Sequence, residues 1–205
     1  MSQYVETAPT AIGLKNVWLP FTPNRDFKED PRIFESAKGI YFYGPDGKKI
    51  LDGSSALFTT PAGHARQEIA DAVYDQIMRL DYTSSFLRSH PTSFAACEQV
   101  VKLLPTGFNQ LFLVNSGSEA IDTALKIAIQ YQRARKQASR TMFVSREKAY
   151  HGANLSGVAL SGIASNRRDF GMPIIPVVHM RNTWLESNRF QDRKSVVRER
   201  VLVAV

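Results

Sequence analysis

Residues 111–128 of this 205-residue chain read LFLV-NSGSEA-IDTALKIA, and they decide how the rest of the sequence is interpreted. Residues 111–114 are a short apolar run with the length of a buried strand. From Ile121 onward, apolar residues recur at the spacing of one face of a helix. The polar residues in between can cap that helix through either Ser116 or Ser118. The stretch therefore predicts a strand over 111–114, a tight turn, and a helix over 117–137.

The predicted turn has a composition that suits an anion. The first N–H groups of a helix have no backbone partner, so they can donate to a bound anion. Gly117 lets a ligand approach the backbone closely, and Ser116 and Ser118 add hydroxyl donors. A phosphate group would be well held here. The same spacing also occurs where serine only caps a helix, so the motif alone leaves both interpretations open.

Three groups of motifs resemble class III aminotransferases, which are pyridoxal phosphate enzymes. The string NSGSEA at 115–120, followed by DTALK at 122–126, resembles the family's cofactor-phosphate turn. The strings YHG at 150–152, LDG at 51–53 and AGH at 62–64 match in order and rough spacing. The resemblance runs from about residue 17 to about residue 183 and is strongest to the ω-amino acid/β-alanine:pyruvate type. It implies an α/β fold of fold type I, with a small N-terminal α+β part and the beginning of a doubly wound, mostly parallel sheet.

A pyridoxal phosphate site needs donors for the phosphate, a flat side chain over the ring, a carboxylate at the pyridine nitrogen and a Schiff-base lysine. The resemblance implies that Ser116, Gly117 and Ser118 hold the phosphate and that Tyr150 covers the ring. His151 would either support these groups from behind or serve as a buried hydrogen-bonding residue.

The aspartate and the lysine of such a site come well after the YHG motif in the family, and neither is identified here. We therefore expect no Schiff-base lysine in this chain, a truncated fold, and little or no activity of the chain by itself. Lys148 is expected to face solvent, and Lys126 to form a surface pair with Asp122, four residues before it.

Two aromatic residues are candidates for substrate contact. Phe58 matches a position where relatives often carry a substrate-facing aromatic, although a core aromatic would fit the sequence as well. Trp18 lies in an apolar patch of a proline-rich segment that the resemblance places near the substrate pocket and a dimer partner; by itself the patch indicates an arm that packs on something larger. The resemblance implies a homodimer that transfers an amino group from an ω-amino acid or amine to an α-keto acid such as pyruvate. A glutamate-1-semialdehyde aminomutase-like or other class III enzyme, and a non-catalytic truncated binding module, are the alternatives.

The order of predicted elements brings the two main motifs together. Residues 33–57 are typical of a meander with a GPDG turn at 44–47, and helices are predicted before Leu80 and over 92–104. His64 is expected to be a loop hydrogen-bonding residue. A further strand is predicted over 141–145. Alternating helices and strands favour a parallel sheet, whose ligands bind at the carboxyl ends of strands, so both motifs should share one edge.

Composition excludes several other classes of protein. The net charge is +7, but residues 181–205 hold six basic against three acidic residues and the other charges are scattered, so we expect no nucleic-acid partner. No apolar run approaches the ~20 residues of a membrane span, and no secretory signal is visible. One cysteine, Cys97, excludes an internal disulfide and is expected to be buried. No metal site is predicted, and the cysteine content fits the cytoplasm.

The chain is expected to have three parts. Residues 1–88 would form an N-terminal segment with part of a small domain, and residues 89–184 an incomplete cofactor-binding large domain. Residues 185–205 have neither the family's pattern nor clear helix or strand signals. They are predicted to be either a non-native stretch or a divergent basic tail.

Overall fold

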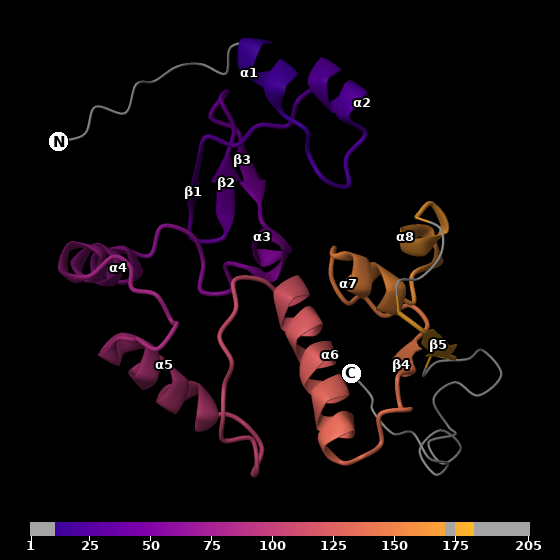
Figure 1. The fold of residues 1–205 in the computed structure, drawn as a ribbon. Coiled ribbons are helices and arrows are strands. Elements are labelled where there is room, and N and C mark those ends of the chain that lie inside the picture. The colour runs from indigo at the N-terminus through magenta and orange to yellow at the C-terminus, as the bar shows by residue number, and fades with distance from the viewer. Residues whose placement is uncertain (1–10, 171–174, 183–205) are drawn as a thin grey trace, which may run out of the picture. The chain divides into compact units, whose positions relative to one another are not determined.

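The computed structural model describes residues 11–170 and 175–182 (Figure 1). The chain forms two compact units, of which unit 1 ends at Ser93 and unit 2 begins at Phe94. The predicted tail, 185–205, lies outside the described residues. The predicted three-part division stays a prediction.

Unit 1 combines short helices with a small antiparallel sheet. Its elements are α1 (Ala11–Asn16), α2 (Asn24–Glu29), β1 (Ser36–Lys38), β2 (Tyr41–Tyr43), β3 (Lys49–Leu51), α3 (Ser55–Phe58) and α4 (Gln67–Arg79).

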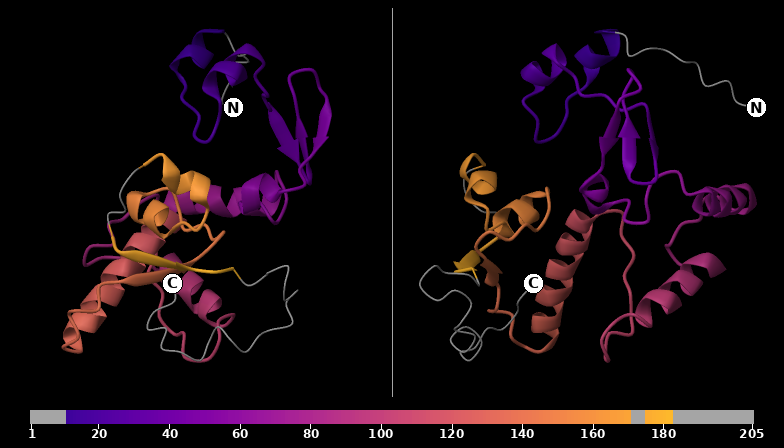
Figure 2. Two further views of the ribbon diagram at one scale, coloured as in Figure 1. Left: turned by 90° about the vertical axis from the view of Figure 1, so that its right-hand side faces the viewer. Right: turned by 180° about the vertical axis from the view of Figure 1, so that it is seen from behind.

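The three strands of unit 1 form the predicted meander, in the order β1-β2-β3 (labelled in Figure 1; Figure 2 gives two further views). Tyr43 pairs with Lys49 across the second hairpin. Its turn closes through a 2.9 Å hydrogen bond from the Gly47 N–H to the Gly44 carbonyl. Gly47 has φ +72°, a conformation that glycine adopts at no steric cost, which is why the GPDG string turns the chain here.

Helix α4 shows the predicted apolar stripe, but the stripe is not covered. Ile69, Val73 and Ile77 are 50%, 52% and 55% exposed. Among the described residues of unit 1, no apolar side chain is fully buried. The secondary structure of this unit therefore rests on local hydrogen bonds more than on a packed core.

Unit 2 contains the longest helix and a pair of parallel strands. The elements are α5 (Pro91–Val101), α6 (Gly117–Ala134), β4 (Phe143–Arg146), α7 (Leu155–Leu160), α8 (Ala164–Arg168) and β5 (Val177–Met180). The boundary between the two units falls within α5.

Strands β4 and β5 pair in parallel, with Phe143 opposite Val177 and Arg146 opposite Met180. Parallel neighbours need a crossover connection, and α7 lies within it. This strand–helix–strand unit is the beginning of the parallel sheet that the sequence predicted. Its core is a cluster of Leu125, Phe143 and Leu160, which joins α6, β4 and α7. Leu125 belongs to the apolar helix face that the spacing from Ile121 indicated.

The predicted strand over 111–114 does not form. Residues 111–114 have no strand assignment, and Phe112 and Leu113 are 71% and 64% exposed. A strand needs a hydrogen-bonded neighbour, and in the described part of unit 2 the strands β4 and β5 pair only with each other. The apolar run at 111–114 therefore lacks the backbone hydrogen bonds to a neighbouring strand that would make it a strand. The prediction that Cys97 is buried is wrong as well. Cys97 is only half-buried, and no residue of its helix, α5, is fully buried.

Candidate functional site

The start of α6 is built by local capping. Ser116 is the N-cap residue, with an extended backbone, and its Oγ accepts a hydrogen bond from the Glu119 N–H at 3.2 Å. The Glu119 carboxylate in turn accepts from the Asn115 N–H at 2.9 Å. In the described part of the chain, the N–H groups of Gly117 and Ser118 have no acceptor. Two donors are therefore left open at the positive end of an 18-residue helix.

A second loop, residues 150–154, is tied to this helix start by two hydrogen bonds. The Ser118 Oγ accepts from the Ala153 N–H at 2.9 Å. The Asp122 Oδ2 accepts from the Asn154 Nδ2 at 2.9 Å. The predicted surface pair between Asp122 and Lys126 is wrong, because one carboxylate oxygen accepts from Asn154 and the other, Oδ1, is buried with no hydrogen-bond partner among the described residues.

Gly152 permits the close approach of the two segments. A Cβ at this position would lie 2.6 Å from the Ser118 Oγ and 3.0 Å from the Ser118 Cα. Its φ of +118° also lies in the region that side chains disfavour. The glycine of the YHG motif is thus required by both space and backbone conformation.

The two segments line an open pocket of about 380 Å³. Its lining comprises Gly117, Ser118, Ile121, Tyr150, His151 and Gly152. The structure therefore brings the two predicted motifs together, as the sequence indicated, although only one of them follows an actual strand. Tyr150 is 57% exposed, so its ring is available to a ligand. Ser116 is not among the lining residues and acts as the cap.

His151 is held from behind by the end of β4. Its Nε2 lies 3.0 Å from the Oγ of Ser145, a residue that is only 3% exposed. Burial lowers the pKa of the His151 imidazole, and the positive charge that His179 would carry when protonated lowers that pKa further. Both causes favour the neutral imidazole. Whether His151 supports the site from behind or is a buried hydrogen-bonding residue stays a prediction.

The two substrate candidates belong to unit 1. Trp18 is 89% exposed, next to a turn in which the Leu19 N–H donates to the Asn24 Oδ1 at 2.8 Å. Phe58 is 81% exposed at the end of α3. Their roles stay predictions.

Sequence reasoning missed three contributors to the site. Ile121 was recognised only as part of the helix face, Ser145 only as a strand end, and Asn154 not at all. No local pattern announces Asn154, because its partner Asp122 lies 32 residues away in the chain.

A family model for "Aminotransferase class-III" matches residues 24–203. The chain belongs to the class III aminotransferase family. The resemblance read from the motifs is thereby confirmed.

Curated members of this family are similar to the chain over most of its length. An omega-aminotransferase of Caulobacter vibrioides is 40% identical over 173 residues, 84% of this chain and 39% of the relative. A beta-alanine–pyruvate aminotransferase of Pseudomonas aeruginosa is 40% identical over 186 residues, 89% of this chain and 41% of the relative. The chain thus spans about two fifths of the length of these class III aminotransferases.

Solved structures confirm the predicted fold class, the α/β fold of these transferases. An omega transaminase from Pseudomonas jessenii in complex with PMP superposes with a TM-score of 0.78 at 28% identity, over 85% of this chain and 39% of that one. A transaminase from the marine bacterium Virgibacillus gives a TM-score of 0.81 at 25% identity, over 85% and 40%.

The described residues contain neither a membrane-spanning helix nor a cluster of metal-ligating side chains. None of their helices has both the length and the apolar character needed to cross a bilayer. Nor do three or more histidine, cysteine, aspartate or glutamate side chains gather there in a way that could hold a metal ion.

Proposed function

We propose that the pocket at the start of α6 holds the phosphate and the ring of pyridoxal phosphate. The observation that carries this proposal is the pair of open N–H groups of Gly117 and Ser118, in one pocket with the exposed ring of Tyr150. Helix N-termini of this kind bind phosphate because unpartnered donors and the helix dipole act together. The name of the Pseudomonas jessenii structure, a complex with PMP, supports the same cofactor class.

Each side chain has a defined part in this proposal. The Ser118 hydroxyl lines the pocket and accepts one backbone hydrogen bond, so it retains its own hydrogen to donate to a phosphate oxygen. The Ser116 hydroxyl caps the helix next to the lining residue Gly117 and would add a donor in the same way. Tyr150 offers its ring face to the pyridine ring. His151, whose pKa is lowered by burial, supports the pocket wall through its hydrogen bond with Ser145. When bound, pyridoxal phosphate supplies a ring that withdraws electrons from the carbon carrying the amino group.

For the whole protein, we propose transfer of an amino group from an ω-amino acid or amine to an α-keto acid such as pyruvate. The names of the relatives that are 40% identical, an omega-amino acid–pyruvate aminotransferase of Pseudomonas putida among them, support this substrate class. Relatives named for adenosylmethionine-8-amino-7-oxononanoate or putrescine are 29–34% identical. Trp18 and Phe58 would contact the amino donor. We also propose a cytoplasmic homodimer, as implied by the resemblance.

The decisive experiment removes one backbone donor while preserving the helix. Gly117→Pro deletes the N–H at the first helical position, where proline is well tolerated. Ser116, with φ −152° and ψ 159°, already has the conformation that a residue before proline prefers. Gly117→Ala is the matched control, because it keeps the N–H and its Cβ would meet nothing within 4 Å.

We expect Gly117→Pro to weaken binding of pyridoxal phosphate about tenfold or more, since a hydrogen bond to a charged group contributes ~1.5–3 kcal/mol. Gly117→Ala should bind more tightly than the proline variant. Pyridoxal without phosphate should bind weakly to all three proteins. Equilibrium dialysis measures the affinities, and circular dichroism checks that the helix persists. Equal affinities for the proline and alanine variants would refute a phosphate site at this helix.

A further inference from the structure

The short element α3 is a left-handed turn. Ser55, Ala56, Leu57 and Phe58 have φ values of 51°, 48°, 59° and 71°. Residues with a side chain adopt this region singly and at a cost in free energy, because Cβ approaches the following carbonyl oxygen. Four consecutive residues without a glycine are therefore unusual, and something outside their own backbone must hold them there.

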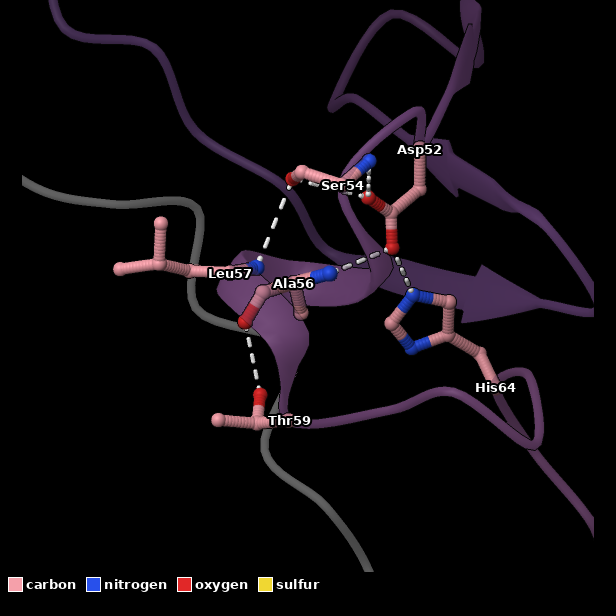
Figure 3. A network of polar contacts seen from close by, with 6 residues as sticks. All are labelled: Asp52, Ser54, Ala56, Leu57, Thr59 and His64. Atoms are coloured by element: carbon pink, nitrogen blue, oxygen red, sulfur yellow. Dashed lines mark hydrogen bonds and ion pairs between the residues drawn. The ribbon is translucent and has the colours of Figure 1, made fainter. Parts of the chain in front are cut away.

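Asp52 supplies the restraint (Figure 3). Its Oδ2 accepts from the Ala56 N–H at 2.8 Å and lies 2.8 Å from the His64 Nε2. Its Oδ1 accepts from the Ser54 N–H at 3.1 Å and from the Ser54 Oγ at 3.3 Å. The Asp52 side chain is only 4% exposed. One carboxylate thus gathers donors from the turn, from the residue before it, and from a loop further along the chain.

His64 connects this carboxylate to the sheet of unit 1. Its N–H donates to the Gly39 carbonyl at 2.7 Å, and its own carbonyl accepts from the Gly39 N–H at 3.1 Å. The imidazole also lies against the Phe42 ring, with centroids 4.6 Å apart. His64 is therefore fixed at the corner between β1 and β2. The sequence correctly predicted it as a loop hydrogen-bonding residue, and the structure adds the partner.

The hydrogen bonds also affect the ionisation of Asp52. The Ala56 N–H first, and the His64 imidazole second, lower the pKa of the carboxyl to about 2. The carboxylate is thus charged at physiological pH, and its hydrogen bonds are of the charge-assisted kind.

The restrained turn leaves two large apolar side chains in solvent. Leu57 is 74% exposed and Phe58 is 81% exposed. Packing within the described residues therefore does little to offset the cost of this backbone, and the hydrogen bonds to Asp52 hold it instead. We propose that Asp52 and His64 are positioning residues, which hold the turn 55–58 left-handed so that Leu57 and Phe58 form a preformed apolar contact for the amino donor. This inference rests on the substrate role given to Phe58 in the proposed function.

The test reads the conformation of the turn directly by NMR of the whole chain. A positive φ brings the amide and α protons of a residue together and gives a strong intraresidue NOE. In the unmodified protein we expect strong NOEs of this kind at 56–58 and backbone order parameters near the rigid value of about 0.85. In Asp52→Asn, which replaces one carboxylate oxygen with a donor, the NOEs should weaken and the order parameters should fall below about 0.6.

Two sets of variants separate positioning from general destabilisation. Asp46→Asn is the matched control, because Asp46 also caps a turn of unit 1 but, among the described residues, accepts only from the Lys48 N–H. It should leave residues 56–58 unchanged. His64→Gln keeps an N–H donor and should preserve the turn, whereas His64→Leu should loosen it. If Asp52→Asn fails to fold, the His64 pair still decides, since the bonds from Ala56 and Ser54 to Asp52 remain.

The inference is overturned if Asp52→Asn folds and keeps the NOEs and order at 56–58, or if Asp46→Asn disturbs them equally. Where Asp52→Asn does not fold, the same NOE intensities and order parameters at 56–58 in His64→Gln and His64→Leu overturn the inference. The proposed function fails by a different result, namely equal pyridoxal phosphate affinity of the Gly117→Pro and Gly117→Ala variants.

Discussion

The turn at 116–118 and the turn at 55–58 are held in opposite ways. The first begins a right-handed helix, needs one side-chain cap, and belongs to a unit with a buried cluster of Leu125, Phe143 and Leu160. The second is left-handed, depends on the Asp52 carboxylate, and belongs to a unit whose described residues bury no apolar side chain fully. A conformation that L-residues favour can be held by packing and one neutral cap, whereas a costly conformation needs strong, directional hydrogen bonds.

The two turns also use their donors differently. At 116–118, the N–H groups of Gly117 and Ser118 have no acceptor in the described chain and remain available to a ligand. At 55–58, the Ala56 N–H is occupied by Asp52 and the Leu57 N–H by the Ser54 Oγ. The first turn is thus suited to recognising an anion through its backbone. The second is suited to presenting side chains, and it consumes its backbone donors to do so.

The largest effect is expected where unit 2 relies on close packing. Gly152→Ala should lower the free energy of unfolding by ~3 kcal/mol, since it adds overpacking against Ser118 to an unfavourable φ. Urea denaturation measures this loss. Gly117→Ala, where a Cβ would meet nothing within 4 Å, should be neutral or slightly stabilising. A loss below about 1 kcal/mol for Gly152→Ala would contradict the close approach of residue 152 to Ser118.

A smaller effect should separate the two serines of unit 2. Ser116→Ala removes the helix cap and Ser118→Ala removes the bond to the Ala153 N–H, each at a cost of ~1 kcal/mol. Hydrogen exchange should distinguish them. The first variant should speed exchange of the Glu119 amide, and the second that of the Ala153 amide. The same exchange pattern in both variants would contradict this division of roles.

The smallest effects are pH-dependent and should fall in separate ranges for the two regions. Folding lowers the His151 pKa, so its contribution to stability is complete above the unfolded value of ~6.5 and decreases as the pH falls through the folded pKa. Folding also lowers the Asp52 pKa, from 3.8 to about 2, so its contribution is complete above pH 3.8 and is lost as the pH falls through about 2. As the pH is lowered in an NMR titration, the chemical shifts around Ala153 should change first, and that of the Ala56 amide should change only in strong acid. A single common transition near pH 6 would contradict the assignment.

Much of the candidate site could be predicted from the amino-acid sequence alone. The helix from Gly117, its Ser116 cap and the meander turn at 44–47 depend on interactions within a few residues, and the periodicity and composition of those segments specify them. The sequence also predicted that the motifs containing Ser118 and Tyr150 lie close together, because it placed both of them at one edge of the sheet. The reasoning was only partly right, because β4 forms and the strand over 111–114 does not.

By itself, then, the sequence determined the family, the local elements and the two motifs of the site, because short-range spacing carries that information. Only the tertiary structure decided that Gly152 must lie against Ser118, that Asp122 bonds Asn154 rather than pairing with Lys126, and that Asp52 and His64 hold a left-handed turn. These features depend on contacts between residues 12 to 35 positions apart. Neither hydrophobic period nor residue propensity encodes such contacts, because both describe a segment in isolation from the rest of the chain.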